Sequence, residues 1–213
     1  QKLYHMLKNY FKIAWRNLLK NKSFSFINIF GLAAGITVAL LIGLWIYQEL
    51  SYDHFHKNKN QIYRVVVNGV SGNSGEKFTM TSVSLPLAET FRKEIPGFKT
   101  VVESNWEGKQ GLKAGDKKFT KYGTDVAPDF FKIFQFKFLR GTAATALQQP
   151  DNIVLTQHTA KVLFGTADPM GQTVRWNNVS DLKVSGIIED MPQNTYFSNF
   201  EYFMSFAHYE NRA

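Results

Sequence analysis

The chain has 213 residues, of which 44% are hydrophobic, enough for one domain with a packed core and an accessory segment. Its formal charge of +8 is unevenly placed, because six of the 25 basic residues lie within the first 22 positions and the first acidic residue is Glu49. The remainder has 19 basic against 17 acidic residues, so we expect no nucleic-acid partner. The absence of cysteine excludes disulfide frameworks, thiol nucleophiles and cysteine zinc sites.

Residues 1–22 predict a basic amphipathic helix on the cytoplasmic side of a membrane. Apolar residues at positions 7, 11, 14 and 18 share one face, and cations at every fourth position share a roughly opposite face. Such a helix lies in the membrane interface with its cations near anionic headgroups, although packing on a partner protein is an alternative. The cations expected to contact lipid headgroups or a partner are Lys8, Lys12, Arg16, Lys20 and Lys22.

Residues 23–50 predict one transmembrane helix. The 26 residues from Ser23 to Gln48 carry no charge, and as a helix they are about 39 Å long, enough to cross a hydrocarbon core of about 30 Å. A cleaved signal peptide has a shorter apolar stretch, and a soluble core helix rarely avoids charge for this length. The preceding positive charges predict a cytoplasmic N-terminus. The expected interfacial anchors are Phe24, Phe26, Trp45, Tyr47 and Tyr52.

A stripe of small residues runs along the predicted span. Gly31, Gly35, Ala39 and Gly43 recur at every fourth position and therefore share one helix face. Small side chains let two helix backbones approach closely in lipid, so the stripe predicts packing against another membrane helix. Glycine and alanine are also frequent in membrane helices generally, which is the alternative explanation.

Residues 51–213 predict an extracytoplasmic α+β domain, because helical and strand patterns are mixed without a regular βαβ alternation. Thr156 is expected to cap a helix that ends at Gly165. We expect strands at 62–67, 100–106, 111–114, 118–122, 152–155 and 200–206, a turn at 69–75, helices at 85–94, 128–133 and 156–164, and a hairpin of 173–176 with 182–188.

No catalytic or cofactor site is predicted. The glycines at 69, 72 and 75 before Lys77 do not form a phosphate-loop motif, and a turn is the better interpretation. His54 and His56 beside Asp53 would share a face if the segment were a strand, but they lack a third metal ligand nearby. No nucleophile, base and orienting group can be assembled, so we expect no enzyme activity in this chain.

Several ordered segments resemble the FtsX-like permeases of ABC transporters, of the MacB and LolC/LolE type. The opening segments that carry the resemblance are Lys12 to Lys22, Ile27 to Leu32, Ser51 to His56 and Gln61 to Val65. The later ones are Phe130-Phe131, Phe136 to Gly141, Ile153 to Thr156, Ala160, Phe164-Gly165, Asp168 to Gly171 and Gly186 to Pro192. These later segments resemble the periplasmic core domain of that family.

The resemblance implies the permease subunit of a transporter in a bacterial inner membrane. It implies a separate or fused ATPase partner that binds ATP and Mg, while this chain holds no cofactor. A second permease copy or half and membrane lipids are further expected partners, and periplasmic or outer-membrane components are candidates. Such permeases have at least four membrane helices, so the chain is expected to be part of a longer permease, with motion passed from the ATPase through the first span to the domain. A single-pass sensor or binding module is the alternative function, and a membrane-anchored enzyme is a third.

Overall fold

The structure is a computed structural model that describes residues 2–54, 56 and 58–211, without the side chains of 2–4 and 7. Phe55 of the family-like segment and the side chain of Leu7 therefore lie outside the described residues. The chain divides into two compact units, Gln1–Ser51 and Tyr52–Ala213, which are described separately.

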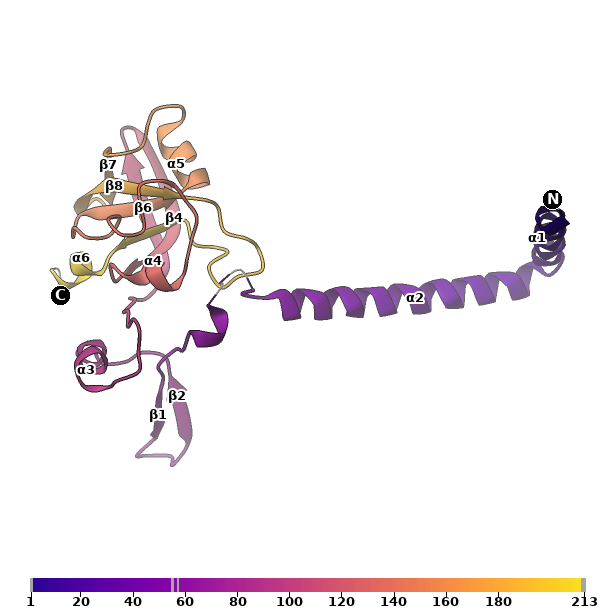
Figure 1. Ribbon diagram of the computed structural model, residues 1–213, viewed down its shortest axis with the longest axis horizontal. Helices are drawn as coiled ribbons and strands as arrows, with labels where there is room; N and C mark the ends of the chain where they lie inside the picture. Colours follow the sequence, from indigo (N-terminus) through magenta and orange to yellow (C-terminus); the bar gives the residue numbers. More distant parts are fainter. Residues whose placement is uncertain (1, 55, 57, 212–213) are drawn as a thin grey trace. The chain divides into compact units, whose positions relative to one another are not determined.

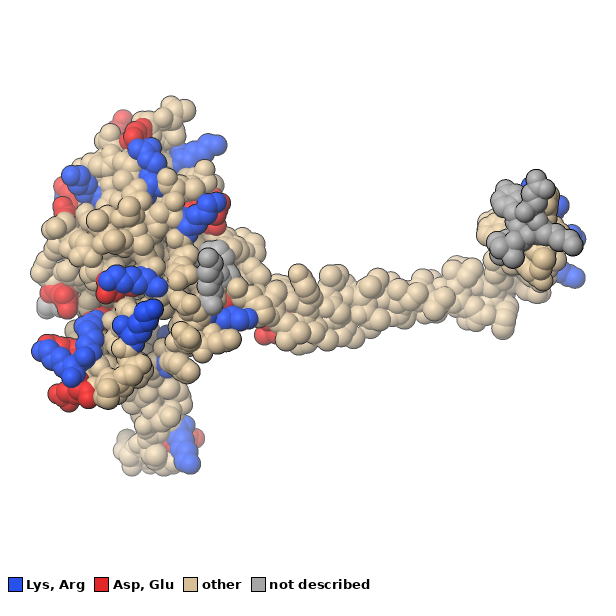
Figure 2. Space-filling view, viewed as in Figure 1, with Lys and Arg blue, Asp and Glu red and all other residues tan. Residues whose placement is uncertain are grey.

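The first unit consists of two helices separated by the single residue Asn21. They are α1 (Lys2–Lys20) and α2 (Lys22–Ser51). Within the described residues, α2 is the one helix long and apolar enough to cross a membrane, and Figure 2 shows it without charged side chains over most of its length. None of its residues is buried by protein. Its length and its apolar composition make α2 a candidate membrane span.

Six strands of the second unit pair in a closed ring (Figure 1). They are β3 (Gly108–Ala114), β4 (Lys117–Val126), β6 (Asn152–Thr156), β7 (Thr173–Trp176), β8 (Ser180–Ile188) and β9 (Tyr202–Ser205). The order is β8-β6-β9-β4-β3-β7, and β7 then pairs with β8 through the hairpin expected from the sequence. The β4–β9 and β6–β8 pairs are parallel and the other pairs are antiparallel. A short strand, β5 (Phe138–Arg140), extends the sheet beside β8.

Two apolar cores lie on the two faces of this sheet. Alternate residues of β6 separate them, since Ile153 and Leu155 belong to one core and Val154 to the other. One core fills the ring with mainly aliphatic side chains, and the other, outside the ring, is rich in phenylalanine, including Phe130 and Phe203. Because both of its faces are covered, every residue of β6 is buried.

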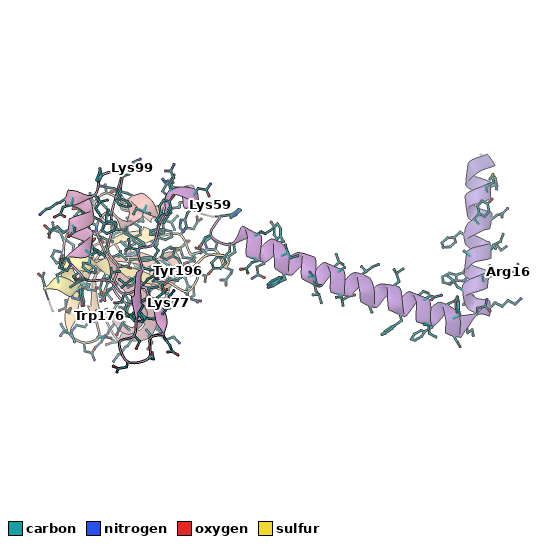
Figure 3. All side chains as sticks on the ribbon, turned by 90° about the horizontal axis from the view of Figure 1, so that it is seen from below. Arg16, Lys59, Lys77, Lys99, Trp176 and Tyr196 are labelled. Atoms are coloured by element: carbon teal, nitrogen blue, oxygen red, sulfur yellow. The ribbon has the colours of Figure 1, made fainter. Side chains whose placement is uncertain are left out.

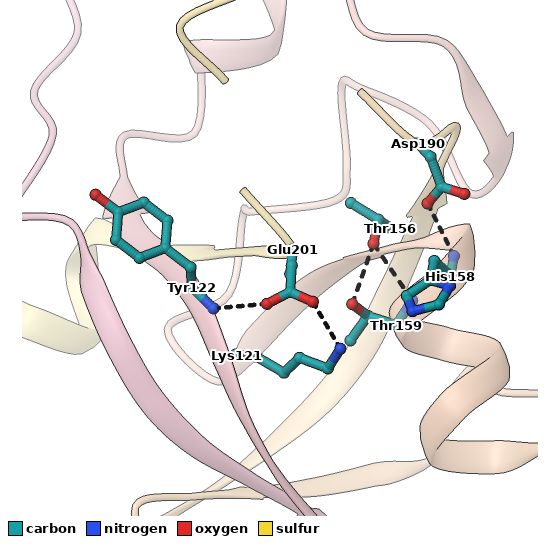
Figure 4. Close-up of polar contacts among 7 residues, drawn as sticks. All are labelled: Lys121, Tyr122, Thr156, His158, Thr159, Asp190 and Glu201. Carbon is teal, nitrogen blue, oxygen red and sulfur yellow. Dashed lines mark hydrogen bonds and ion pairs between the residues drawn. The ribbon is translucent and has the colours of Figure 1, made fainter. Parts of the chain in front are cut away.

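We call the ring of six strands the barrel. Three short helices accompany it: α4 (Phe130–Ile133), α5 (Gln157–Phe164) and α6 (Phe206–Glu210). The first turn of α5 is capped twice (Figure 4). The Thr156 hydroxyl accepts a hydrogen bond from the Thr159 amide at 3.3 Å, and the Asp190 carboxylate accepts one from the His158 amide at 2.9 Å. These bonds fix α5 between β6 and the end of β8.

Within the second unit, the residues that precede the barrel form a separate lobe, which we call the second lobe and which has no core of its own. It contains a 3₁₀ turn at Lys59–Gln61, the hairpin β1 (Val67–Val70) with β2 (Lys77–Met80), and α3 (Leu87–Glu94). No residue from 58 to 111 is buried. Large apolar side chains such as Tyr63 and Trp106 are exposed there. The barrel therefore supplies the packing of this unit.

Most predicted elements of the second unit are confirmed, as is the α+β fold class. The expected strands at 111–114, 118–122 and 152–155, the helices at 85–94, 128–133 and 156–164, and the hairpin at 173–188 all form, with small shifts of their ends. The strand expected at 200–206 is shorter, because α6 begins at Phe206.

Two strand predictions in the second lobe are wrong. Residues 62–66 are extended but unpaired, and pairing starts only at Val67, where the turn brings back the unpredicted strand β2. The turn expected at 69–75 forms, but it starts later because β1 extends to Val70. The segment 100–106 forms a single bridge, Ser104 with Val126, instead of a strand. β-Branched residues favour extended backbone, but a strand exists only where a partner backbone is available.

Candidate functional site

Asp53, the second residue after α2, is hydrogen-bonded into the second unit. Its carboxylate Oδ1 accepts a hydrogen bond from the Thr195 hydroxyl at 2.7 Å and another from the Tyr196 amide at 2.9 Å. Its own amide donates to the Asn194 carbonyl at 2.9 Å. Thr195 is fully buried, so the carboxylate reaches into the folded body of the domain. Asp53 has a φ of 55°, a conformation that aspartate tolerates better than most residues.

His56 continues this attachment into the phenylalanine-rich core. Its side chain is only 5% exposed. The rings of Phe134, Phe136 and Phe197 meet it edge-on with centroids at 5.2, 5.8 and 5.7 Å. Burial lowers the pKa of His56, and the nearby Asp53 carboxylate partly opposes that shift. The imidazole is therefore held in the neutral form at neutral pH. We call Asp53, His56, Thr195 and Tyr196 the junction cluster.

The segment that receives Asp53 connects β8 to β9 and is itself anchored to β4. Glu201 at its end pairs with Lys121, with Nζ and Oε1 separated by 2.6 Å, and its other oxygen accepts from the Tyr122 amide at 3.0 Å (Figure 4). The Glu201 amide in turn donates to the Tyr122 carbonyl at 2.7 Å. The segment bonded to Asp53 is thus connected to β8 and β9 along the chain and to β4 through Glu201.

Tyr196 adds a second polar contact beside the junction. Its hydroxyl donates a hydrogen bond to the Glu107 carboxylate at 2.9 Å. Burial and this acceptor raise the pKa of Tyr196. Figure 3 shows Tyr196 in the second unit.

The residues predicted from the sequence to pack in the membrane, contact headgroups or anchor at the interface lie outside the junction cluster. Gly31, Gly35 and Gly43 on α2 have nothing within 4 Å of an added Cβ, so the stripe is open to a partner helix. All five cations assigned to headgroup or partner contact are exposed in the first unit. Figure 3 shows Arg16 projecting from α1. The anchors Phe24, Phe26, Trp45, Tyr47 and Tyr52 are also exposed. Lipid contact and helix packing remain predictions for them.

The segment around His54 does not suit a metal site. Residues 51–54 form a helix end and a turn instead of a strand, so the premise that His54 and His56 share a strand face is wrong. His54 is exposed whereas His56 is buried among phenylalanines. Across the described residues there is no group of three side chains able to hold a metal ion.

No local sequence pattern predicted Thr195 and Tyr196 as partners of Asp53. They are 142 and 143 positions away from Asp53, and no local pattern connects the two segments. The only available signal was the aromatic run at 130–138, which indicated an aromatic core without revealing that His56 enters it.

Comparisons with known proteins agree on one type of domain. Residues 25–213 match the family described as the MacB-like periplasmic core domain. The search of curated proteins gives no match.

Two solved structures share the fold. The periplasmic region of MacB from Actinobacillus actinomycetemcomitans is 20% identical with a TM-score of 0.51, over 69% of this chain and 66% of that one. A domain assigned to a permease protein from Porphyromonas gingivalis is 19% identical with a TM-score of 0.57, over 72% of this chain and 65% of that one. The chain thus spans slightly less than two thirds of the length of these structures.

Proposed function

Because this chain belongs to the family of MacB-like periplasmic core domains, which are domains of ABC-transporter permeases, we propose that it relays motion from a membrane helix to an extracytoplasmic domain. The driving motion would come from a partner ATPase that binds ATP and Mg. The result would be export or extrusion of a substrate. The family and α2 together make it a membrane-anchored protein.

The observation that carries this proposal is the short chain path from α2 to the junction cluster. A single residue, Tyr52, separates the end of α2 at Ser51 from Asp53. Asp53 makes three hydrogen bonds to residues 194–196, and His56 is buried three residues later. A force along α2 therefore meets a bonded attachment to the core, with no long linker to absorb it.

Sidedness and partners follow from the same proposal. The cations of α1 would keep the N-terminus in the cytoplasm of a bacterial cell, at the inner membrane, and contact anionic lipids or the ATPase. The small-residue stripe of α2 would pack against a second permease copy or permease half. Periplasmic or outer-membrane components remain candidate partners of the domain.

The test inserts two glycines between Ser51 and Tyr52 in the complete transporter, purified with its ATPase. We expect ATP hydrolysis to continue while the ATP-dependent change in hydrogen exchange of the barrel strands, and export, are lost. The reason is that flexible residues would absorb the displacement before it reaches Asp53.

A matched control inserts the same two glycines between Gly72 and Asn73, in the exposed turn from β1 to β2. This variant should keep both ATP hydrolysis and the response of the barrel. If the junction insertion also left the response and export intact, the relay would not run through this connection.

A further inference from the structure

Three cations lie in one row across three strands of the barrel. The register pairs Lys113 of β3 with Lys118 of β4 on one side and with Arg175 of β7 on the other. The residues flanking Lys113 and Arg175 point into the ring, since Leu112 and Val174 are fully buried. Successive residues of a strand alternate in direction, so the three cations share the outer face.

The row borders an open hollow of about 300 Å³. Its lining is formed by Lys113, Gly115, Thr173, Arg175 and Asn178. The four polar side chains among these all offer N–H or O–H donors, and none is a carboxylate. A hollow lined this way suits an anion and does not suit a metal cation.

Arg175 is held in place by its neighbours. Its Nη1 pairs with the Asp181 carboxylate at 2.8 Å, and its Nη2 donates to the Asn178 carbonyl at 3.0 Å. A guanidinium has five N–H groups, so these two bonds leave donors for a ligand. A fixed arginine loses less conformational entropy on binding than a freely rotating one.

The charges of Lys113 and Lys118 are not balanced locally. Neither forms an ion pair with any carboxylate of the described residues. Like charges directly opposite each other on neighbouring strands destabilise the pair. A bound anion would remove that repulsion.

We propose that this hollow on β3 and β7 binds a phosphate group, held by Lys113 and Arg175 with Thr173 and Asn178 donating hydrogen bonds. Lys118 would add to the positive potential from the next strand. Arginine presents paired donors that match phosphate oxygens, and lysine supplies a point charge. The volume suits a small phosphorylated ligand or the headgroup of a phospholipid. The proposal is independent of the transport function.

Binding is measured by calorimetry on the complete chain in nanodiscs of neutral lipid. Inorganic pyrophosphate probes the free-phosphate source, and short-chain phosphatidic acid below its micelle concentration probes the lipid-headgroup source. We expect saturable binding of at least one probe that weakens as salt is added. Lys113→Gln should weaken it by about tenfold, as expected for losing one partly exposed charge contact.

Two variants keep this test specific. Lys99→Gln removes an equal charge from the second lobe and should leave affinity unchanged, while Lys113→Arg should retain most of it. These lysines are exposed, so the fold is expected to survive each change. Absence of saturable binding of both probes, or an equal loss in Lys99→Gln and Lys113→Gln, would overturn the proposal.

Discussion

Substitutions of Asp53 test the junction cluster most directly. Asp53→Ala removes two hydrogen bonds to a carboxylate, at 2.7 and 2.9 Å. Bonds to charged groups contribute about 1.5–3 kcal/mol each when shielded. The aspartate is half-buried, so solvent reduces this to about 1 kcal/mol each. A further about 1 kcal/mol arises because alanine disfavours the φ of 55°.

The series Asp53→Asn, Asp53→Gly and Asp53→Ala should therefore destabilise the domain progressively. We expect losses of about 1, 2 and 3 kcal/mol, because asparagine keeps an acceptor and tolerates positive φ, and glycine tolerates only the φ. Native-state hydrogen exchange of the Tyr196 amide is the assay, since that amide is the donor to Asp53. The alanine variant should exchange about 100-fold faster at this position.

Asp116→Ala, in the exposed turn between β3 and β4, is the matched control and should change stability by less than about 0.5 kcal/mol. An alanine variant whose Tyr196 amide exchanged at the control rate would show that Asp53 does not hold the domain. Equal effects of asparagine and alanine would refute the reasoning about acceptor and φ.

Three more outcomes are expected. Because the folded-state pKa of His56 lies below its unfolded value, the stability it contributes is full above about pH 6.5 and falls as the pH drops toward the folded pKa. His56→Gln should therefore reduce the dependence of the melting temperature on pH between pH 7.5 and 5.5, and an unchanged dependence would contradict this. Gly123→Ala should cost about 3 kcal/mol or more in urea unfolding, because an added Cβ would lie 2.4 Å from the Tyr202 carbonyl oxygen, whereas Gly111→Ala meets nothing closer than 3.5 Å and should be mild. Gly35→Ile should weaken copurification of differently tagged permease copies, since it fills the proposed packing face, and full retention would argue against that face.

Local patterns predicted the elements whose signals are contained in a few neighbouring residues. Thr156 and Gly165 bound α5 as expected, because an N-cap hydroxyl and a glycine at positive φ act within one helical turn. The second lobe was harder, since its valines favour extended backbone whether or not a partner strand exists. Pairing there depends on where the chain turns back, which the composition of 69–75 did not specify closely enough.

The sequence by itself determined that residues 23–48 form an apolar helix, because charge and hydropathy act locally and need no partner. It also indicated an α+β domain, because strand and helix periodicities are read within short windows. Only the tertiary structure decided that β7 also pairs with β3 and so closes the sheet, and that Asp53 meets Thr195 across 142 positions. Contacts between distant segments depend on the summed packing of the whole chain, so no window of sequence contains them.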